Sequence, residues 1–404
     1  MRDRTPTKVL ENGALRYGVY DADGTFLRYE HLVLDDQPTQ EGTPLNKASL
    51  LKDSTAALLG LGTDAVPDDA FVALVLGQGV YGYRVKVQLA DGTPVEGATV
   101  SGIQPLTGST LVTGEDGIVL GKSTSASVTI GCTSPYIDQK APATQTVTKT
   151  GTITNVTLTL ENVTDMLTII SSKTVKISSM AKTLDVTAVG GGGGGGSGTE
   201  NDTTGGGSGG GGGYAKTVLG ATVKEGNVTI TIGSGGASSA TTTSSGTSTG
   251  GTGGKTTVKF GDVTVCEANG GNGGISAPYN SAATIPSGGV GNGVGGGGSG
   301  GSDYYSYVGS PGTAGNKYIF DDTSLGLAGG GGGGGGTGYA KSSEFYENNV
   351  GGAPNGGKGD VRESNGTLIA GSAGKSMGGG GGGGTMHKQG YNGGAGGVYL
   401  RFHF

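Results

Sequence analysis

The sequence predicts a mostly β protein whose C-terminal part is built from polyglycine II helices, and three observations lead to this fold class. Glycine makes up 92 of the 404 residues, and 74 of these 92 follow residue 189. Many stand in unbroken blocks with only four prolines after residue 190, which excludes the Gly-X-Y repeat of collagen. Alternating polar and apolar segments, typical of half-buried strands, flank the blocks. The blocks are residues 190–196, 209–213, 295–298, 329–336 and 378–384.

Residues 1–77 are predicted to form a small α+β region with one hairpin and two short helices. Asp-Gly at 23–24 supplies a turn between the strand-like segments 19–20 and 25–27. Apolar residues between 50 and 58 lie at helical spacing, Gly60 can end that helix, and Pro67 can begin the next. Asp21-x-Asp23-Gly24 also resembles the start of a calcium loop, but its ligand pattern is incomplete and predicts no metal site. Helices this short are expected to dock rather than to build a catalytic domain.

Residues 78–163 are predicted to form a small β-sandwich. Tyr83, Val85, Val87 and Leu89 alternate with polar residues, and Asp91-Gly92 and Asp116-Gly117 provide turns. Six or seven short strands at this spacing are typical of a sandwich. The segments 91–100 and 114–117 resemble carboxypeptidase-regulatory-like and bacterial Ig-like modules, and this resemblance implies a spacer rather than a catalyst.

Residues 164–404 form the glycine-rich part, for which disorder is the alternative interpretation because glycine and serine make flexible linkers. Strand-like segments at 183–188, 227–232, 258–265 and 398–404 argue against a linker. The first and last of these strands are expected to pair and to close the domain. Glycine is costly to order, so an unbroken block needs a compensating structure. Polyglycine II helices provide one, because helices without side chains can pack side by side and hydrogen-bond laterally.

The remaining composition excludes several classes of function. The net charge of −6 argues against a basic surface that would bind nucleic acid. The sequence has no apolar run of about 18 residues, so membrane insertion is not predicted. The N-terminus has no apolar core of a secretory signal, so synthesis in a cytoplasm without this signal is expected. Cys132 and Cys266 lie in regions of different composition and are not expected to form a disulfide. We therefore predict no cofactor, no metal, no catalytic residue and no enzyme activity.

Several motifs of the glycine-rich part resemble glycine-rich domains of bacteriophage tail proteins. The pattern is similar in principle to the polyglycine-helix sandwich of the fibre-tip adhesins of T-even phages. Segments 42–47 and 65–71 resemble stretches of tail-fibre proteins from phages and prophages of Gram-positive bacteria. The motifs in the glycine-rich part are residues 187–190, 213–216, 228–236 and 393–400, with Gly338-Tyr339-Ala340-Lys341 repeating the Gly-Tyr-Ala-Lys element of 213–216.

This resemblance implies a receptor-binding subunit of a phage tail fibre, located in the virion. Region 1–77 is then expected to bind other tail or baseplate proteins, and region 164–404 to bind a glycan or protein receptor on a bacterial surface. Fibres of this kind are commonly homotrimers, whereas the T-even tip adhesin is a monomer. A structural decoration protein without receptor contact is the alternative, and a polysaccharide-cleaving fibre is a less favoured one.

Aromatic residues gather in the loops between the glycine blocks and are the predicted receptor-binding residues. Tyrosine beside Asn, Asp and Ser suits adaptable recognition, and its ring can stack on the C–H face of a sugar. The alternative is that individual rings cover the ends of the lattice or pack between subunits. The predicted residues are Tyr304, Tyr305, Tyr307, Tyr318, Phe320, Phe345, Tyr346, His387 and Tyr391.

Overall fold

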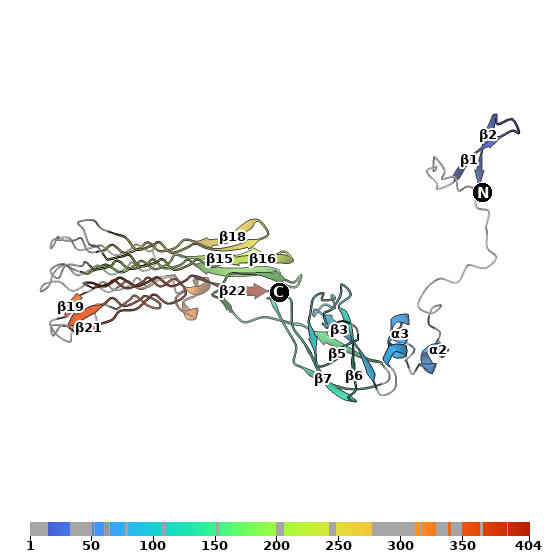
Figure 1. The fold of residues 1–404 in the computed structure, drawn as a ribbon, viewed down its shortest axis with the longest axis horizontal. Coiled ribbons are helices and arrows are strands. Elements are labelled where there is room, and N and C mark those ends of the chain that lie inside the picture. The colour runs from blue at the N-terminus through green and yellow to red at the C-terminus, as the bar shows by residue number, and fades with distance from the viewer. Residues whose placement is uncertain are drawn as a thin grey trace. The chain divides into compact units, whose positions relative to one another are not determined.

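The computed structural model confirms the mostly β fold class, with strands along most of the described chain and short helices, among the described residues, near the N-terminus and around residue 320 (Figure 1). The chain divides into two compact units, Met1–Gly77 and Gln78–Phe404. The structure describes residues 15–32, 51, 53–59, 61, 63, 65–76, 80–106, 108, 110–150, 153–198, 206–241, 248–276, 312–315, 317–328, 338–340, 350–363, 367–385 and 387–404.

The first unit contains the expected hairpin, made of strands β1 (Leu15–Tyr20) and β2 (Phe26–Leu32) in antiparallel pairing. The Asp21 Oδ1 atom accepts hydrogen bonds from the backbone N–H groups of Asp23 and Thr25. The loop that resembles a calcium site is therefore closed by its own backbone donors. The two expected helices are present as α2 (Asp53–Leu58) and α3 (Pro67–Leu76).

The second unit begins with a sandwich whose two sheets enclose a separate apolar core. Tyr83, Val85, Val87 and Leu89 are buried as their alternation predicts, and Ile130 and Leu158 belong to the same core. One sheet has the order β10-β3-β6-β5, made of Ile153–Thr159, Tyr81–Gln88, Ile118–Ser123 and Gln104–Pro105. The other has the order β4-β7-β9, made of Val100–Ser101, Ser127–Cys132 and Gln145–Thr148.

A buried carboxylate joins this sandwich to the glycine-rich part. Asp138, which is fully buried, accepts hydrogen bonds from the backbone N–H and the hydroxyl of Ser178. The Ile137 N–H also donates to the Lys176 carbonyl, 2.9 Å away. Strands β8 (Gln139–Lys140) and β11 (Glu161–Asn162) pair at the same place. These contacts connect the predicted regions 78–163 and 164–404 within one compact unit.

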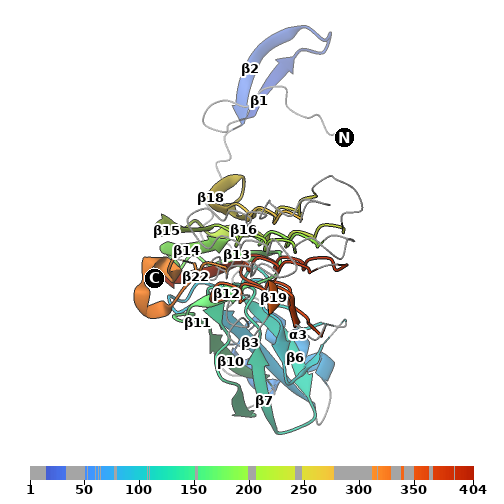
Figure 2. The same ribbon diagram turned by 90° about the vertical axis from the view of Figure 1, so that its left-hand side faces the viewer.

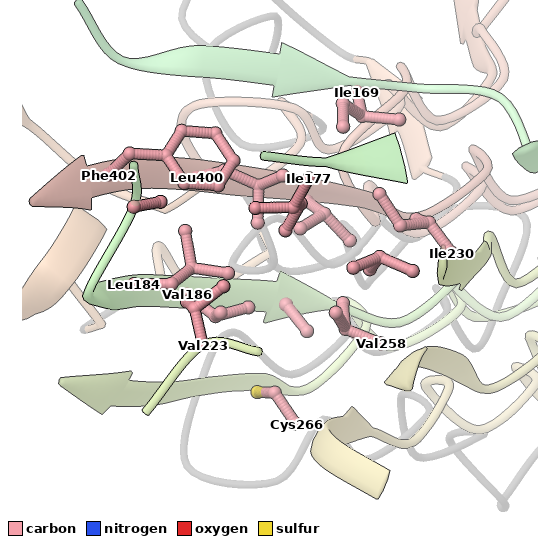
Figure 3. Packing of buried hydrophobic residues seen from close by; sticks show 14 of the residues in the cluster. Ile169, Ile177, Leu184, Val186, Val223, Ile230, Val258, Cys266, Leu400 and Phe402 are labelled. Atoms are coloured by element: carbon pink, nitrogen blue, oxygen red, sulfur yellow. The ribbon is translucent and has the colours of Figure 1, made fainter. Parts of the chain in front are cut away.

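The glycine-rich part starts as two four-stranded sheets packed face to face. Their shared core includes Leu184, Ile230, Val258 and Leu400, all nearly or fully buried (Figure 3). The expected pairing of the first and last strands is confirmed, because β14 and β22 are antiparallel neighbours. One sheet is β12-β22-β14-β15, made of Leu167–Ile169, Gly397–His403, Thr183–Val189 and Ala215–Thr222. The other is β13-β16-β17-β18, made of Lys173–Ile177, Gly226–Thr231, Thr256–Phe260 and Val263–Ala268.

Six of these strands continue into extended glycine-rich segments that run side by side away from the sheets (Figures 1 and 2). Residues 190–198 leave β14, for example, and residues 206–214 return into β15. We call this bundle the lattice, its junction with the strands the sheet end, and the opposite end the tip.

The segment 190–198 lies at the centre of the lattice with six neighbours. It donates hydrogen bonds to three antiparallel segments and accepts them from three parallel ones. Bonds between successive neighbours close the ring around it, as when Gly253 donates to Gly271 and Gly210 to Gly381. In order around the centre, the neighbours are residues 206–214, 269–276, 248–255, 233–241, 391–396 and 378–384.

The hydrogen bonds of the central segment repeat every three residues. The N–H groups of Gly190, Gly193 and Gly196 all donate to the segment 206–214, at 2.8 Å each. Along the central segment, each next N–H group points one third of a turn further around the helix axis. The N–H groups between those three residues therefore donate to the other two antiparallel neighbours. A threefold helix with outward N–H and C=O groups is the polyglycine II conformation. The backbone of this segment is thereby satisfied without any side chain.

The lattice explains why its centre is glycine and its surface is not. Residues 190–197 are all buried, and a Cβ atom on Gly193 would overlap the Asn272 carbonyl oxygen. On outer segments such as 248–255 and 269–276, every third position faces outward and carries a side chain. Asn269 and Asn272 are exposed in one such row, and Thr249, Thr252 and Lys255 in the next.

Candidate functional site at the tip of the lattice

Serine side chains end the lattice on the tip side. Ser197, at the end of the central segment, donates its backbone N–H to the Ser239 Oγ at 2.8 Å. The Ser239 hydroxyl lies 2.7 Å from that of Ser276, which in turn lies 2.9 Å from that of Ser248. The Ser197 Oγ also accepts the N–H of Gly390 at 3.2 Å. Hydroxyls therefore replace the lateral backbone bonds where the glycine segments stop.

Two excursions of the chain leave the lattice at the tip. The first contains strands β20 (Val361–Glu363) and β21 (Leu368–Ile369), which pair antiparallel, while β19 (Gly338–Ala340) pairs with β20 in parallel (Figure 1). The second is the loop 385–390, which connects the segments 378–384 and 391–396. Both excursions are anchored on one residue.

That residue is Asp360, a fully buried carboxylate at the end of the segment that precedes β20. Its Oδ1 accepts the Gly371 N–H at 2.7 Å and the Tyr391 hydroxyl at 2.6 Å. Its Oδ2 accepts the Thr385 N–H at 3.1 Å, and its own N–H donates to the Gly383 carbonyl. Burial of this charge is compensated by three donors, as an ionised carboxylate requires.

The Tyr391 side chain is half-buried and serves this same arrangement. Burial, and the hydrogen bond that its hydroxyl donates to Asp360, raise the pKa of Tyr391 well above the usual range of tyrosine. Because its phenol donates a hydrogen bond to a buried carboxylate, Tyr391 holds the end of the loop in place. Tyr391 was predicted from the sequence as a receptor-binding residue, and the structure gives it this internal partner.

The exposed residues of the two excursions form what we call the tip surface, defined as residues 367–370 and 387–389. His387 lies there with a φ of 59°, in the left-handed region that a residue with a Cβ rarely occupies. Lys388 and Gln389 beside it are exposed, and Leu368 and Ile369 of the other excursion are each 37% exposed. The surface therefore combines hydrogen-bond donors with a small apolar area.

Two other predicted residues lie at the sheet end, away from the tip. Phe320 belongs to the helix η1 (Ile319–Asp321), is only 3% exposed, and packs against Val189 and Met377. Its N–H donates to the Thr187 hydroxyl at 2.8 Å, and Arg401 lies 4.6 Å from the centre of its ring. Phe320 is thus a core residue, and its buried ring leaves no surface for a receptor. This fits the alternative given above, in which some aromatic rings cover an end of the lattice. Tyr318 precedes it and is 36% exposed.

The other five predicted residues lie outside the described residues, so their placement stays a prediction. They are Tyr304, Tyr305, Tyr307, Phe345 and Tyr346. The sequence analysis missed Asp360, Leu368, Ile369, Lys388 and Gln389. A lone carboxylate between a glycine-rich segment and a short alternating strand is the signal that could have indicated Asp360.

The tip offers groups for noncovalent binding. Across the described ranges, no group of three His, Cys, Asp or Glu side chains is assembled in the manner of a metal site. Within the same described part of the chain, no helix is both long and apolar enough to cross a bilayer.

Comparison with known families agrees with the lattice. The model of a glycine-rich domain matches residues 168–403, which is more than half of the chain and includes both four-stranded sheets from β12 onward. No curated protein matches the sequence.

Proposed function

The chain belongs to the glycine-rich domain family, and we propose that it is a non-enzymatic receptor-binding subunit of a phage tail fibre or a related adhesin. The observation that carries this proposal is the contrast between the glycine centre of the lattice and the side chains at its tip. Its central segment, residues 190–196, accepts only glycine, whereas its tip presents two excursions with exposed polar and apolar side chains. Binding residues are commonly placed on loops that a rigid scaffold positions.

The proposed ligand is a glycan or protein receptor on a bacterial surface, bound through the tip surface and the aromatic loops. Region 1–77 docks on other tail or baseplate proteins of the particle, and the sandwich acts as a spacer. In the virion, a homotrimer would multiply weak contacts by avidity. The resemblance to tail proteins supports these assignments, together with the position of the tip at the opposite end of the lattice from the sandwich.

Adsorption of the purified full-length protein to susceptible bacteria tests the proposal. We expect saturable binding that competes with adsorption of the particle. A variant with Lys388→Ala and Gln389→Ala should bind more weakly, whereas Lys173→Ala with Thr174→Ala, exposed on β13 at the sheet end, should bind normally.

Two results would contradict the proposal in different ways. Absence of binding to every susceptible strain, with normal adsorption of particles that lack the protein, would indicate a structural decoration protein. Release of reducing sugar from purified surface polysaccharide would indicate a polysaccharide-cleaving fibre.

A further inference from the structure

We infer that Asp360 is the positioning residue of the tip, because its one carboxylate closes both excursions that carry the tip surface. The identification of the tip as a receptor-binding surface rests on the proposed function, but the closure itself does not. The inference rests on four hydrogen bonds from three separate parts of the chain.

The first excursion is closed at both of its ends. Asp360 directly precedes β20, and its Oδ1 accepts the N–H of Gly371, which follows β21. A Cβ atom on Gly371 would overlap the Lys358 carbonyl oxygen and press against the Tyr391 ring, so the backbone lies close to both there. The hairpin between residues 361 and 370 therefore begins and ends at the same carboxylate.

The second excursion is closed in the same way. The Asp360 Oδ2 accepts the N–H of Thr385 at the start of the loop, and Oδ1 accepts the hydroxyl of Tyr391 just after its end. Within the loop, Lys388 donates its N–H to the Thr385 carbonyl at 2.9 Å. The backbone that carries Lys388 is thus two hydrogen bonds away from Asp360.

The chemistry of the site requires a carboxylate rather than an amide of the same shape. An ionised aspartate is an acceptor on both oxygens, and both Asp360 oxygens face N–H or O–H donors. Asparagine would turn its NH₂ group toward at least one of these donors and lose that bond. Because Asp360 is fully buried, water cannot replace the lost partner.

The substitution Asp360→Asn in the full-length chain tests the inference, with Asp322→Asn as the matched control. Asp322 also accepts a backbone N–H, from Ser324 at 2.9 Å, but it lies in the sheet-end segment. Hydrogen–deuterium exchange followed by mass spectrometry is measured on peptides covering 367–374 and 384–391. We expect exchange in both peptides to accelerate about tenfold or more in Asp360→Asn, with peptides of β14 and β22 unchanged. The control should leave all four peptides unchanged.

A second variant keeps the test informative if Asp360→Asn does not fold. Tyr391→Phe removes one donor and leaves the carboxylate in place, so only the peptide 384–391 should exchange faster. Two results together would overturn the inference. The first is unchanged exchange of the tip peptides in Tyr391→Phe. The second is an Asp360→Asn protein whose tip peptides exchange at the unaltered rate, or whose whole lattice exchanges faster.

Adsorption to susceptible bacteria separates this inference from the proposed function. A folded Asp360→Asn protein with an unchanged melting temperature should lose about tenfold or more in affinity. Faster exchange at the tip, combined with no adsorption by the unaltered protein, would refute the receptor-binding proposal and support the positioning role. Faster exchange with undiminished adsorption would show that Asp360 does not position the receptor-binding residues.

Discussion

Arg401 and Asp185 are register partners on the adjacent strands β22 and β14, and their side chains form a two-donor ion pair. The Arg401 Nε and Nη2 atoms lie 3.0 and 2.7 Å from the Asp185 Oδ2. The His403 Nε2 lies 2.8 Å from the same oxygen, and the Gly220 N–H donates to Oδ1. The pair therefore holds the last strand of the domain onto the first strand that enters the lattice.

Asp185→Asn should destabilise the glycine-rich part. The Asp185 side chain is only 6% exposed, and the substitution would leave the Arg401 guanidinium without its charged partner. Hydrogen bonds to charged groups contribute about 1.5–3 kcal/mol, and because Arg401 is about one third exposed we expect the lower part of this range. Denaturant unfolding of the variant measures the change. An unaltered unfolding midpoint would show that the ion pair does not stabilise the strand pairing.

The same carboxylate should make stability depend on acid pH. Burial raises the pKa of Asp185, but the Gly220 N–H, His403 and Arg401 lower it more strongly, so the pKa lies below its ordinary value. The group then stabilises the fold above the unfolded-state pKa of about 3.9, and this contribution is lost as pH falls through the folded-state pKa. Melting temperatures measured from pH 6 down to about pH 2 should fall more steeply in the unaltered protein than in Asp185→Asn. Parallel curves would contradict the assignment.

Gly193→Ala should damage the lattice from its centre. The added methyl group would overlap the carbonyl of Asn272, which belongs to a packed neighbouring segment that cannot move independently. Overpacking of this kind costs about 1–3 kcal/mol, and more where the backbone cannot shift. Thr252→Ala, exposed on an outer segment, is the control and should change stability by less than about 0.5 kcal/mol. Thermal unfolding of both variants distinguishes the two positions, and equal effects would argue against the observed packing.

Tyr391 should make the tip sensitive to alkaline pH. Its pKa is raised by burial and by the Asp360 hydrogen bond, so the folded state holds the phenolic proton more tightly than the unfolded state does. The resulting stability is present below the ordinary tyrosine pKa of about 10 and is lost as pH rises above it. Hydrogen exchange of peptide 384–391, measured from pH 8 to about pH 11 with correction for intrinsic rates, should show this loss. The same loss of protection in Tyr391→Phe would show that another group is responsible.

The lattice should also give an unusually small heat-capacity change on unfolding. Exposure of apolar surface raises the heat capacity, and exposure of peptide groups lowers it. Residues 190–196 are all glycine and bury backbone only, so unfolding this part exposes peptide surface with little apolar surface. Scanning calorimetry should therefore give less than the usual value of about 12–15 cal/mol/K per residue. A value within this range would mean that an apolar core dominates the transition.

Local patterns predicted the strands and their pairing better than they predicted the site. The alternation in segments 183–188 and 398–404 was enough to indicate β14 and β22, and the Asp-Gly turns marked the hairpin between β1 and β2. Alternation reports which face of a strand is buried, and this information is contained in neighbouring residues.

The sequence also contains a signal that predicts part of the lattice surface, although the sequence analysis did not use it. Asn269 and Asn272 follow the period of three that polyglycine II imposes on outward positions, as do Thr249 and Thr252. A search for non-glycine residues at this period would have identified the outer segments 248–255 and 269–276 and separated them from the all-glycine centre.

The roles of Phe320 and Asp360 could not be obtained in this way, because long-range contacts determine both. Phe320 lies in a short loop segment whose sequence does not indicate a partner, but Thr187 and Arg401 hold it against the sheet end. Asp360 looks like a solvated loop carboxylate until the chain brings Gly371, Thr385 and Tyr391 around it.

The ring of hydrogen bonds around residues 190–198 has a mechanical consequence. These bonds lie across the long axis of the segments, so a force applied between the tip and the sheet end would load them in shear. Bonds loaded in shear resist together, whereas bonds at a peeling edge break one after another. The glycine core would thus be strong against pulling along its length.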